Sequence, residues 1–246
     1  MKSVSAGTTN EDNIGAWSQV SYAELDAFGD EGDFARQHLL TPALLALLGD
    51  VAGTAVLDAG AGNGYLARKL ARMGASVTAV EPADGPFQYI VAREAREPLG
   101  LTCIQQDLST LDQLAGYFDA VIANMVLLDI PDFRPAIANC LAALRPGGAF
   151  IFSLEHPFTD VAGRGELPFP VSDYFTERAF PRTHGDNFHR TLETYIDAVA
   201  DCGGVIARIK EPRLAEAVAR LHPERAWASK LPAFLVVQAR KFSLAS

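Results

Sequence analysis

The chain has 246 residues, of which 49% are hydrophobic, so it is long enough to bury a sizeable core. Its 21 basic residues are outnumbered by 30 acidic residues, which gives a formal net charge of -9, and no basic run interrupts this balance. Affinity for a phosphate backbone depends on Lys and Arg displacing counterions, so this composition disfavours a nucleic-acid partner.

The cysteines and the amino terminus indicate the compartment. Cys103, Cys140 and Cys202 are far apart, lie among apolar residues and include no CxxC pair. We interpret them as reduced core residues and predict no metal site. Residues 1–13 lack the apolar segment of a signal peptide, and no stretch has the length needed to span a bilayer. We therefore expect a cytoplasmic protein without a membrane partner.

In chain order, residues 1–13 are rich in Ser, Thr, Gly and Asn, which predicts a disordered tail before a single domain at 14–246. The segment Trp17–Leu48 contains two helical patterns. Thr41 precedes Pro42 as a capping residue would, and leucines then form an apolar face as far as Gly49. Residues 14–50 are predicted to form a helical lid that precedes the sheet.

From Thr54 onward, short apolar runs alternate with helix-length segments, which predicts an α/β fold with a doubly wound, mostly parallel seven-stranded sheet. Strands are expected at Ala55–Ala59, Ser76–Val80, Thr102–Gln105, Ala120–Asn124, Ala149–Leu154, Val205–Lys210 and Phe234–Ala239. Helices are expected at Tyr65–Met73, Phe133–Leu144, Leu192–Cys202 and Ala215–Leu221. The second of these ends at Arg145-Pro146-Gly147-Gly148, a stop signal.

Residues 155–190 break this alternation, because they carry many Pro, Gly, Asp, His and aromatic residues without a sustained period. A stretch this long and irregular inside a compact domain is usually functional or disordered. Its aromatic content favours a function, so it is predicted to be an insertion that helps to form a binding site.

A glycine-rich segment, Asp58-Ala59-Gly60-Ala61-Gly62-Asn63-Gly64, ends the first strand. Glycines at this point let the backbone approach a ligand closely, but the spacing differs from the G-x-G-x-x-G of dinucleotide sites. Glu81 ends the second strand, twenty-one positions after Gly60. Its carboxylate can accept two hydrogen bonds from a ribose diol, or it can cap the following helix with Pro82 beside it.

With this loop, the chain resembles the class I S-adenosylmethionine (SAM)-dependent methyltransferases over residues 39–154, and among them the small-molecule branch of the type 11/25 kind. The resemblance implies a Rossmann-like fold, SAM as cofactor and S-adenosylhomocysteine as product. It also assigns the parts of SAM to residues here: the methionine part to Asp58, Gly60, Ala61, Gly62 and Gly64, the ribose to Glu81 with Pro82 beside it, the adenine to Asp107 and Leu108, and the sulfonium side to Asn124 and Met125. Asp107 could instead cap a short helix.

In the amino-terminal segment, Trp17 and Tyr22 resemble the aromatic pair with which many family members cover SAM, and Arg36 could pair with its carboxylate. Core packing is the alternative for Trp17, and a surface ion pair is the alternative for Arg36. Lid helices of this kind also make a homodimer plausible.

The acceptor is expected to be a small molecule. Base-methylating enzymes typically carry Asn-Pro-Pro-Tyr where this chain has Asn124-Met125-Val126-Leu127. The aromatic residues of the insertion favour an apolar or aromatic acceptor from secondary metabolism, and the alternative is that they form the insertion's own core. They are Phe158, Phe169, Tyr174, Phe175 and Phe180. The acceptor atom, whether oxygen, nitrogen or carbon, is not specified.

Methyl transfer needs alignment and a deprotonated nucleophile, and histidine is the natural base near neutral pH. His156 lies in a His-Pro-Phe segment directly after the fifth strand, and His189 begins His-Arg-x-Leu-x-x-Tyr, both similar to segments of small-molecule members. We predict these two histidines as catalytic or acceptor-binding residues. The alternative makes His156 a turn organiser and lets His189 with Arg190 cap a helix.

Three other functions remain open from the sequence. The chain could be an RNA-directed methyltransferase, a nicotinamide-dependent oxidoreductase, since Glu81 would serve NAD equally well, or a SAM-binding regulator without catalysis. The acidic balance argues against the first of these.

Overall fold

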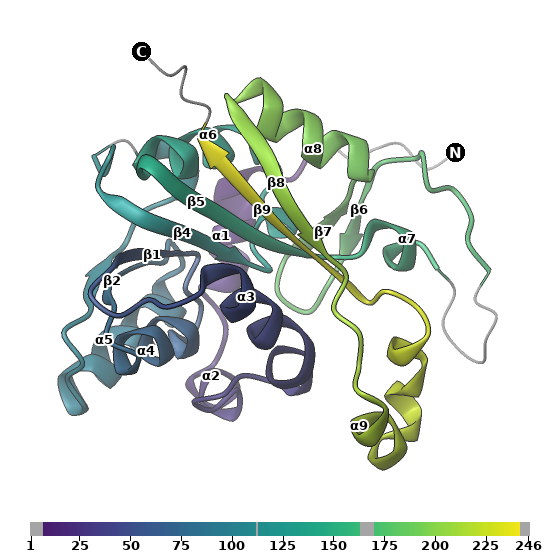
Figure 1. Ribbon diagram of the computed structural model, residues 1–246, viewed down its shortest axis with the longest axis horizontal. Helices are drawn as coiled ribbons and strands as arrows, with labels where there is room; N and C mark the ends of the chain where they lie inside the picture. The colour runs from purple at the N-terminus through teal and green to yellow at the C-terminus, as the bar shows by residue number, and fades with distance from the viewer. Residues whose placement is uncertain (1–6, 112, 163–169, 242–246) are drawn as a thin grey trace.

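The computed structural model describes residues 7–111, 113–162 and 170–241. Its centre is a seven-stranded sheet with the order β3-β2-β1-β4-β5-β9-β8 (Figure 1). The first five strands run parallel, and β9 is antiparallel to both of its neighbours. The strands span β1 Ala55–Ala59, β2 Ser76–Val80, β3 Thr102–Ile104, β4 Phe118–Asn124, β5 Leu144–Glu155, β8 Gly204–Lys210 and β9 Phe234–Lys241. The predicted doubly wound, mostly parallel fold is confirmed.

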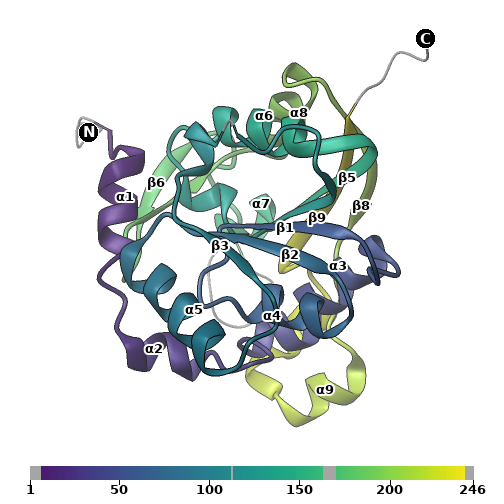
Figure 2. The same cartoon turned by 90° about the vertical axis from the view of Figure 1, so that its left-hand side faces the viewer.

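Helices cover both faces of this sheet, which explains why its central strands are apolar on both sides. One face packs against α3 (Thr41–Leu48), α4 (Tyr65–Arg72) and α5 (Asp84–Arg96). The other packs against α6 (Arg134–Ala143) and α8 (Leu192–Asp201), as Figures 1 and 2 show. The strand order reverses between β1 and β4, so the carboxyl ends of these strands form the switch point at which such sheets bind ligands.

The bounds of β1 and β2 agree with the sequence prediction, and α6 stops at Ala143, directly before the Pro-Gly segment. Strand β5 begins earlier than expected because Leu144 already pairs with Phe118 of β4. The register then shifts, and pairing resumes between Ala149 and Ala120. The predicted stop residues Arg145–Gly148 therefore form an irregularity inside β5.

The predicted tail is too long. Helix α1 (Asn10–Trp17) starts inside it, with a capping box in which the Thr9 side chain accepts from the N–H of Asp12. Asn13 is only 3% exposed, because tertiary hydrogen bonds compensate for its polarity. After α2 (Tyr22–Ala27), the π-helix η1 (Arg36–Leu40) runs directly into α3. Residues 1–6 lie outside the described part of the chain.

Thr41 does not cap α3, contrary to the sequence interpretation. It has helical backbone angles, because η1 continues into α3 without a break. Its hydroxyl lies 3.3 Å from the hydroxyl of Tyr65 instead. A residue chosen as a helix start is therefore part of a buried polar contact between α3 and α4.

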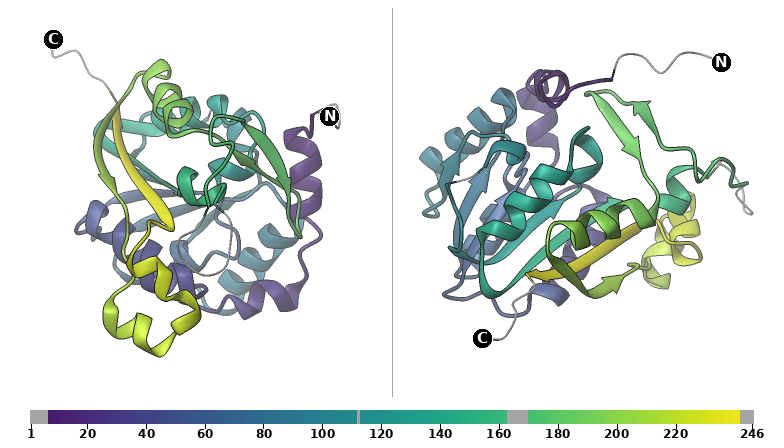
Figure 3. Two further views of the ribbon diagram at one scale, coloured as in Figure 1. Left: turned by 90° about the vertical axis from the view of Figure 1, so that its right-hand side faces the viewer. Right: turned by 90° about the horizontal axis from the view of Figure 1, so that it is seen from above.

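The insertion at 155–190 is more regular than its sequence suggests. It contains α7 (Pro157–Asp160) and an antiparallel hairpin of β6 (Arg178–Pro181) and β7 (Asp186–His189). Figures 2 and 3 show this hairpin beside α1. The Asn13 side chain joins the two, because its amide donates to the carbonyl of Asp186 and accepts from the N–H of the same residue. Strands of four residues with no apolar alternation are stabilised by such contacts, which no sequence period reveals. Residues 163–169, including Phe169, lie outside the described residues.

The carboxyl-terminal part supplies β9 and β8, and β8 is the edge strand of the sheet. Between β8 and β9, α9 (Glu216–Leu221) and η4 (Pro223–Ser229) form a small separate core with Leu39 and Phe34. Two short 3-10 turns, η2 (Leu108–Thr110) and η3 (Leu127–Asp129), follow β3 and β4. Among the residues that the structure describes, no helix combines the length and apolar character needed to cross a membrane.

Arg190, directly after β7, holds the loop that follows β4. It is 6% exposed, and its guanidinium donates hydrogen bonds to the carbonyls of Leu127 (3.1 Å), Ile130 (2.7 Å) and Pro131 (2.8 Å). The guanidinium also lies 4.2 Å from the ring centroid of Phe133. Instead of capping α8, this side chain fixes the backbone that forms one wall of the pocket described below.

We expect Arg190→Met to lower the free energy of unfolding by at least about 2 kcal/mol, because it leaves buried carbonyls without donors. Arg178→Met is the matched control: Arg178 also lies over a ring, that of Phe180, but its hydrogen bonds are exposed, so its substitution should change stability by less than about 0.5 kcal/mol. Urea titrations of both variants measure the difference. Equal effects would contradict the role given to Arg190.

Candidate active site

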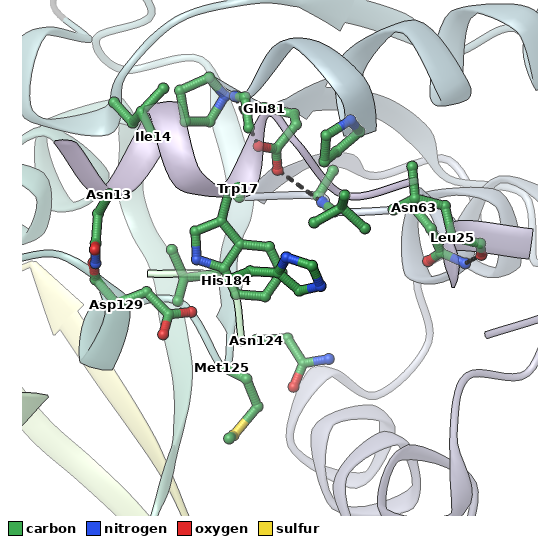
Figure 4. A pocket seen from close by; sticks show the side chains of 18 of the residues that line it. Asn13, Ile14, Trp17, Leu25, Asn63, Glu81, Asn124, Met125, Asp129 and His184 are labelled. Carbon is green, nitrogen blue, oxygen red and sulfur yellow. Dashed lines mark hydrogen bonds between the residues drawn. The ribbon is translucent and has the colours of Figure 1, made fainter. Parts of the chain in front are cut away.

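A cavity of about 480 Å³ lies at the carboxyl ends of the central strands. Its walls come from the loop after β1, the ends of β2, β3 and β4, helices α1 and α2, and the turn of the β6–β7 hairpin. In the view of Figure 4, Trp17 and His184 lie in the middle, with Glu81 on one side and Asn124 and Met125 on the other. The position matches the switch point of the sheet.

The glycine loop lines this pocket with backbone. Gly60, Gly62 and Gly64 all have left-handed φ angles, between 58° and 78°, which only glycine adopts freely. A Cβ atom on Gly60 would lie 2.6 Å from a methyl group of Val126, whereas one on Gly62 would meet nothing within 4 Å. The loop thus packs tightly at Gly60 and opens toward the cavity at Gly62. Gly64 lies behind it as the N-cap of α4 and is absent from the lining.

Glu81 is joined to that loop. Its two carboxylate oxygens accept hydrogen bonds from the N–H groups of Gly62 (2.8 Å) and Ala83 (2.9 Å). Burial nevertheless raises the pKa of Glu81 to about 7. A carboxylate oxygen can accept more than one hydrogen bond, so both oxygens keep acceptor capacity for a ligand in the pocket. Pro82 and Ala83 line the cavity next to it.

Asp58 presents a second buried carboxyl group, at the tip of β1. It is 2% exposed, and its Oδ2 atom has no hydrogen-bond partner among the described residues. Burial raises the pKa of Asp58 to about 7, and the nearby charge of Glu81 adds to the effect. A buried acceptor without a partner is energetically unfavourable, so this oxygen is suited to a ligand that brings its own N–H donor.

Asp107 and Leu108 line the side of the pocket near β3. Asp107 caps η2, because its Oδ1 accepts from the N–H of Ser109 at 2.9 Å. Its Oδ2 accepts from the Ser109 hydroxyl and, at 3.5 Å, from Asn10 of α1. The capping interpretation from the sequence is therefore correct, and it coexists with a position on the cavity wall.

The end of β4 is fixed by a buried chain of hydrogen bonds. The Asn124 amide donates to the hydroxyl of Tyr65 (2.7 Å) and accepts from that of Ser153 (2.7 Å). Met125 follows in the left-handed region, at φ 62°, and its N–H is bound by both the hydroxyl (2.9 Å) and the carbonyl (3.2 Å) of Ser153. A non-glycine residue keeps such a conformation only where its surroundings impose it, so this wall is rigid.

The amino-terminal helices and the hairpin form a cover. The rings of Trp17 and His184 lie in contact at a tilt of 42°, with centroids 5.8 Å apart, and His184 also bonds Glu24 of α2 at 3.1 Å. Arg36 lines the pocket but pairs with Asp33 at 3.0 Å. Tyr22, expected in the lid, is 53% exposed and packs on Tyr89 outside the cavity. Tyr22 is the first residue of α2, and from there its side chain lies outside the cavity.

The two predicted catalytic histidines lie outside the pocket. His189 is 1% exposed, with its ring nitrogens bound to Asp160 (2.9 Å) and to the carbonyl of Tyr174 (2.9 Å). His156 caps α7 and bonds Glu211 at 3.1 Å, and burial lowers its pKa. Both histidines hold parts of the insertion together. The prediction that they lie in the active site is therefore wrong. The sequence motif marked a structural segment that carries the hairpin.

The pocket also contains polar residues that were not assigned from the sequence, among them Asn13, Tyr65, Asp129 and His184. Of these, only Asp129 could have been found from the sequence. It is an acidic residue at the end of the apolar segment after β4, and acidic residues after the other strands had already been chosen as candidates. Asn13 and His184 reach the pocket only through tertiary contacts. No group of three or more His, Cys, Asp or Glu residues that could hold a metal ion occurs within the described ranges.

The sequence profile described as "Methyltransferase domain" matches residues 57–152. Among curated proteins, "Ubiquinone biosynthesis O-methyltransferase" of Methylocella silvestris is 36% identical over 146 residues, covering 50% of this chain and 56% of that protein. The protein of the same name from Coxiella burnetii is 30% identical over 151 residues, covering 59% and 64%. The matches thus span less than two thirds of these relatives.

Solved structures match more of the chain. A "S-adenosylmethionine dependent methyltransferase from Mesorhizobium loti" superposes with a TM-score of 0.75 and 28% identity, covering 87% of this chain and all of that one. The 1,6-didemethyltoxoflavin-N1-methyltransferase of Burkholderia thailandensis shares the fold at a TM-score of 0.57 and 22% identity, with 82% and 76% covered.

The sheet order, the pocket at its switch point and these matches agree. Residues 57–152 match the methyltransferase domain, and the chain shares the fold of the class I SAM-dependent methyltransferases.

Gly60 and Gly62 allow a paired test of the loop, because an alanine at either carries the same left-handed penalty, about 1–2 kcal/mol. Only Gly60→Ala also forces its Cβ against Val126, so it should unfold at the lower denaturant concentration. Gly62→Ala should be the more stable variant but should bind S-adenosylhomocysteine more weakly, since its methyl group extends into open space at the pocket. Urea titration and calorimetry measure the two effects. The opposite order of stabilities would contradict this packing.

Proposed function

We propose that the chain transfers the methyl group of SAM to an oxygen, nitrogen or carbon atom of a small molecule. The observation that carries this proposal is the arrangement of Glu81. Its buried carboxylate is bound to Gly62 of the glycine loop and keeps acceptor capacity beside the cavity. This is the arrangement that a ribose diol next to a backbone-lined pocket requires.

The remaining pocket residues fit the other parts of SAM. The unpartnered Oδ2 of Asp58 can accept from an ammonium group, and the guanidinium of Arg36 has N–H groups left for a carboxylate. Asp107, Leu108 and Pro82 can flank the adenine. When bound, SAM supplies a methyl group activated by the positive charge on sulfur.

The protein residues then have two tasks. The rigid wall at Asn124 and Met125, fixed by Ser153, orients the groups bound beside it. Trp17 and His184 cover the cavity and keep water away from the reacting atoms. No covalent bond to the protein is needed.

The acceptor is proposed to be a small, apolar or aromatic molecule. Ile14, Trp17, Ile130 and Pro131 give the cavity apolar walls beside Met125. The names of the relatives, which refer to ubiquinone biosynthesis and to a toxoflavin precursor, agree with acceptors of this kind. An RNA strand would need basic residues around the opening, and the chain carries a net charge of -9.

The proposal is tested by calorimetric titration with SAM and S-adenosylhomocysteine. We expect both to bind, and we expect Glu81→Ala to weaken binding roughly 10- to 100-fold, because hydrogen bonds to a charged acceptor are lost. Glu216→Gln, an exposed change on α9, is the control and should leave affinity unchanged. Binding of NADH in place of both ligands would overturn the proposal.

The affinity should also depend on pH. Only the ionised Glu81 accepts hydrogen bonds with both oxygens, and its pKa is raised to about 7, so protonation as the pH falls through that value should weaken binding. We expect the dissociation constant for S-adenosylhomocysteine to increase from pH 8 to pH 6. Glu81→Gln cannot titrate, so its dissociation constant should vary less over this range. An identical slope in both proteins would assign the pH dependence to another group.

A further inference from the structure

One carboxylate in the cavity is not needed to hold the donor. Asp129 ends η3, lines the pocket four residues after Met125 and belongs to the loop that Arg190 fixes. Its N–H donates to the carbonyl of Val126 at 2.8 Å, and its own carbonyl accepts from the Asn13 amide at 2.5 Å. With its backbone held on both sides, the side chain enters the pocket from a fixed point (Figure 4).

Asn187 of β7 determines which oxygen of Asp129 is available. The Nε of Arg182 donates to Oδ1 of Asn187 at 2.7 Å, so the amide oxygen faces Arg182 and the NH₂ group faces Asp129. That NH₂ group donates to Oδ1 of Asp129. For Oδ2, the described residues supply no hydrogen bond. Oδ2 is therefore the oxygen that can take up a proton from a molecule in the pocket.

The surroundings give this carboxyl group an unusual affinity for protons. Burial raises the pKa of Asp129 to about 8, and the charge of Glu155 contributes in the same direction. Charged groups of several elements act on its pKa: Glu155 of β5 and Glu81 after β2 raise it, whereas Arg36 of η1 and Arg182 of the hairpin turn lower it. The His184–Glu24 pair also lines the pocket. The two arginines favour the ionised form and so limit the shift.

The part of the cavity around Asp129, here called the chamber, also has apolar walls. Ile130, Pro131 and Met125 line it, and the rings of Trp17 and His184 close it. The indole N–H of Trp17 is buried and has no hydrogen-bond partner among the described residues, so the chamber also offers one donor. A molecule with a flat apolar frame and one acidic hydroxyl matches these groups. A carboxylated one does not, because two negative charges would share a poorly solvated space.

We propose that Asp129 is the general base of methyl transfer, that Asn187 and Arg182 position it, and that the acceptor group is a phenol-type hydroxyl. The proposal rests on the methyltransferase function proposed above. As the phenol oxygen forms its bond to the methyl carbon, its proton passes to Oδ2 of Asp129. The electron pair of the broken carbon–sulfur bond stays on the sulfur, which becomes a neutral thioether.

The choice of a phenol follows from matching proton affinities. A base works best on a group whose pKa is close to its own, and a phenolic hydroxyl such as that of Tyr ionises near about 10. Aliphatic alcohols hold their protons far more strongly than a carboxylate can overcome. An amine is the rival acceptor, because a carboxylate could also bind its cation.

The first test uses catechol as the phenol probe and phenethylamine as the amine probe, each at saturating SAM. We expect the phenol alone to be methylated, and Asp129→Asn to lower kcat about 10²- to 10⁴-fold while the affinity for SAM persists. An asparagine at 129 can still accept from Asn187, so the fold is retained. Asp132→Asn removes an exposed carboxylate three residues away and should keep the wild-type kcat.

A second test needs no turnover. 4-Nitrocatechol is coloured when ionised, and its nitro group makes the hydroxyl more acidic than an ordinary phenol, so the probe is an anion at a pH above the pKa of Asp129. In the complex with S-adenosylhomocysteine at such a pH, we expect the wild type to take up a proton as it binds the anion, because Asp129 becomes protonated beside it. Asp129→Asn should bind the anion without this uptake.

Asn187 provides a test of positioning. Its N–H stabilises the ionised form of Asp129, so Asn187→Ala should raise the pKa of Asp129. The base acts when ionised, so kcat falls as the pH drops through this pKa. In a plot of kcat against pH, the acidic side of the variant's profile should therefore shift to higher pH by on the order of one unit. A purely structural role would lower kcat without this shift.

The outcomes separate the two proposals. If the wild type binds no SAM, the methyltransferase function is lost. If it binds SAM but methylates only the amine probe or fails to bind nitrocatechol, the phenol assignment is overturned. Undiminished kcat in Asp129→Asn, or the same proton uptake in both proteins, would overturn the role of Asp129 alone.

Discussion

The structure depends on how it accommodates three carboxyl groups, those of Asp58, Glu81 and Asp129, around one cavity. Each is removed from bulk water, which disfavours its charge, and each receives a different compensation. Glu81 has two backbone N–H groups, Asp129 has the amide of Asn187, and Oδ2 of Asp58 has no partner among the described residues. A ligand with hydrogen-bond donors and a positive charge lowers the free-energy cost of these buried carboxylates, whereas an anion raises that cost.

The backbone explains why these groups can meet at all. Parallel strands end at the same edge of the sheet, and the reversal of strand order between β1 and β4 leaves that edge open. The glycine loop then allows main chain to approach where side chains would block the space. The same loop carries the N–H of Gly62 to Glu81, so one short segment both opens the cavity and stabilises its ionised wall.

The sequence was sufficient for the parts of the molecule that follow local rules. Strands β1 and β2 are short apolar runs next to glycine or charged residues, so their bounds could be predicted directly. The glycine-rich loop between β1 and α4 indicated where the pocket lies. The positions of Asp58, Glu81, Asp107, Asn124 and Met125 on its wall follow from their places at strand ends. Their contacts with SAM stay a prediction.

The parts that depend on distant contacts could not be predicted in this way. Asn13 is polar and lies in a polar segment, so nothing local distinguishes it from a tail residue, yet its partners are 116 and 173 positions away along the chain. His189 stands in a motif that suggested chemistry, but Asp160 and Tyr174 occupy both of its nitrogens. Polar residues gain their roles from partners that only the folded chain brings near.

The placement of α1 affects how the limits of this domain should be drawn. Hydrophobic pattern alone sets its start at residue 14, yet Asn10 and Asn13 are part of the cavity wall and connect α1 to the loop after β4 and to the hairpin. A chain trimmed to residue 14 would keep the sheet and the glycine loop while losing one side of the chamber. Residues 10–13 therefore belong with the domain that carries the cavity.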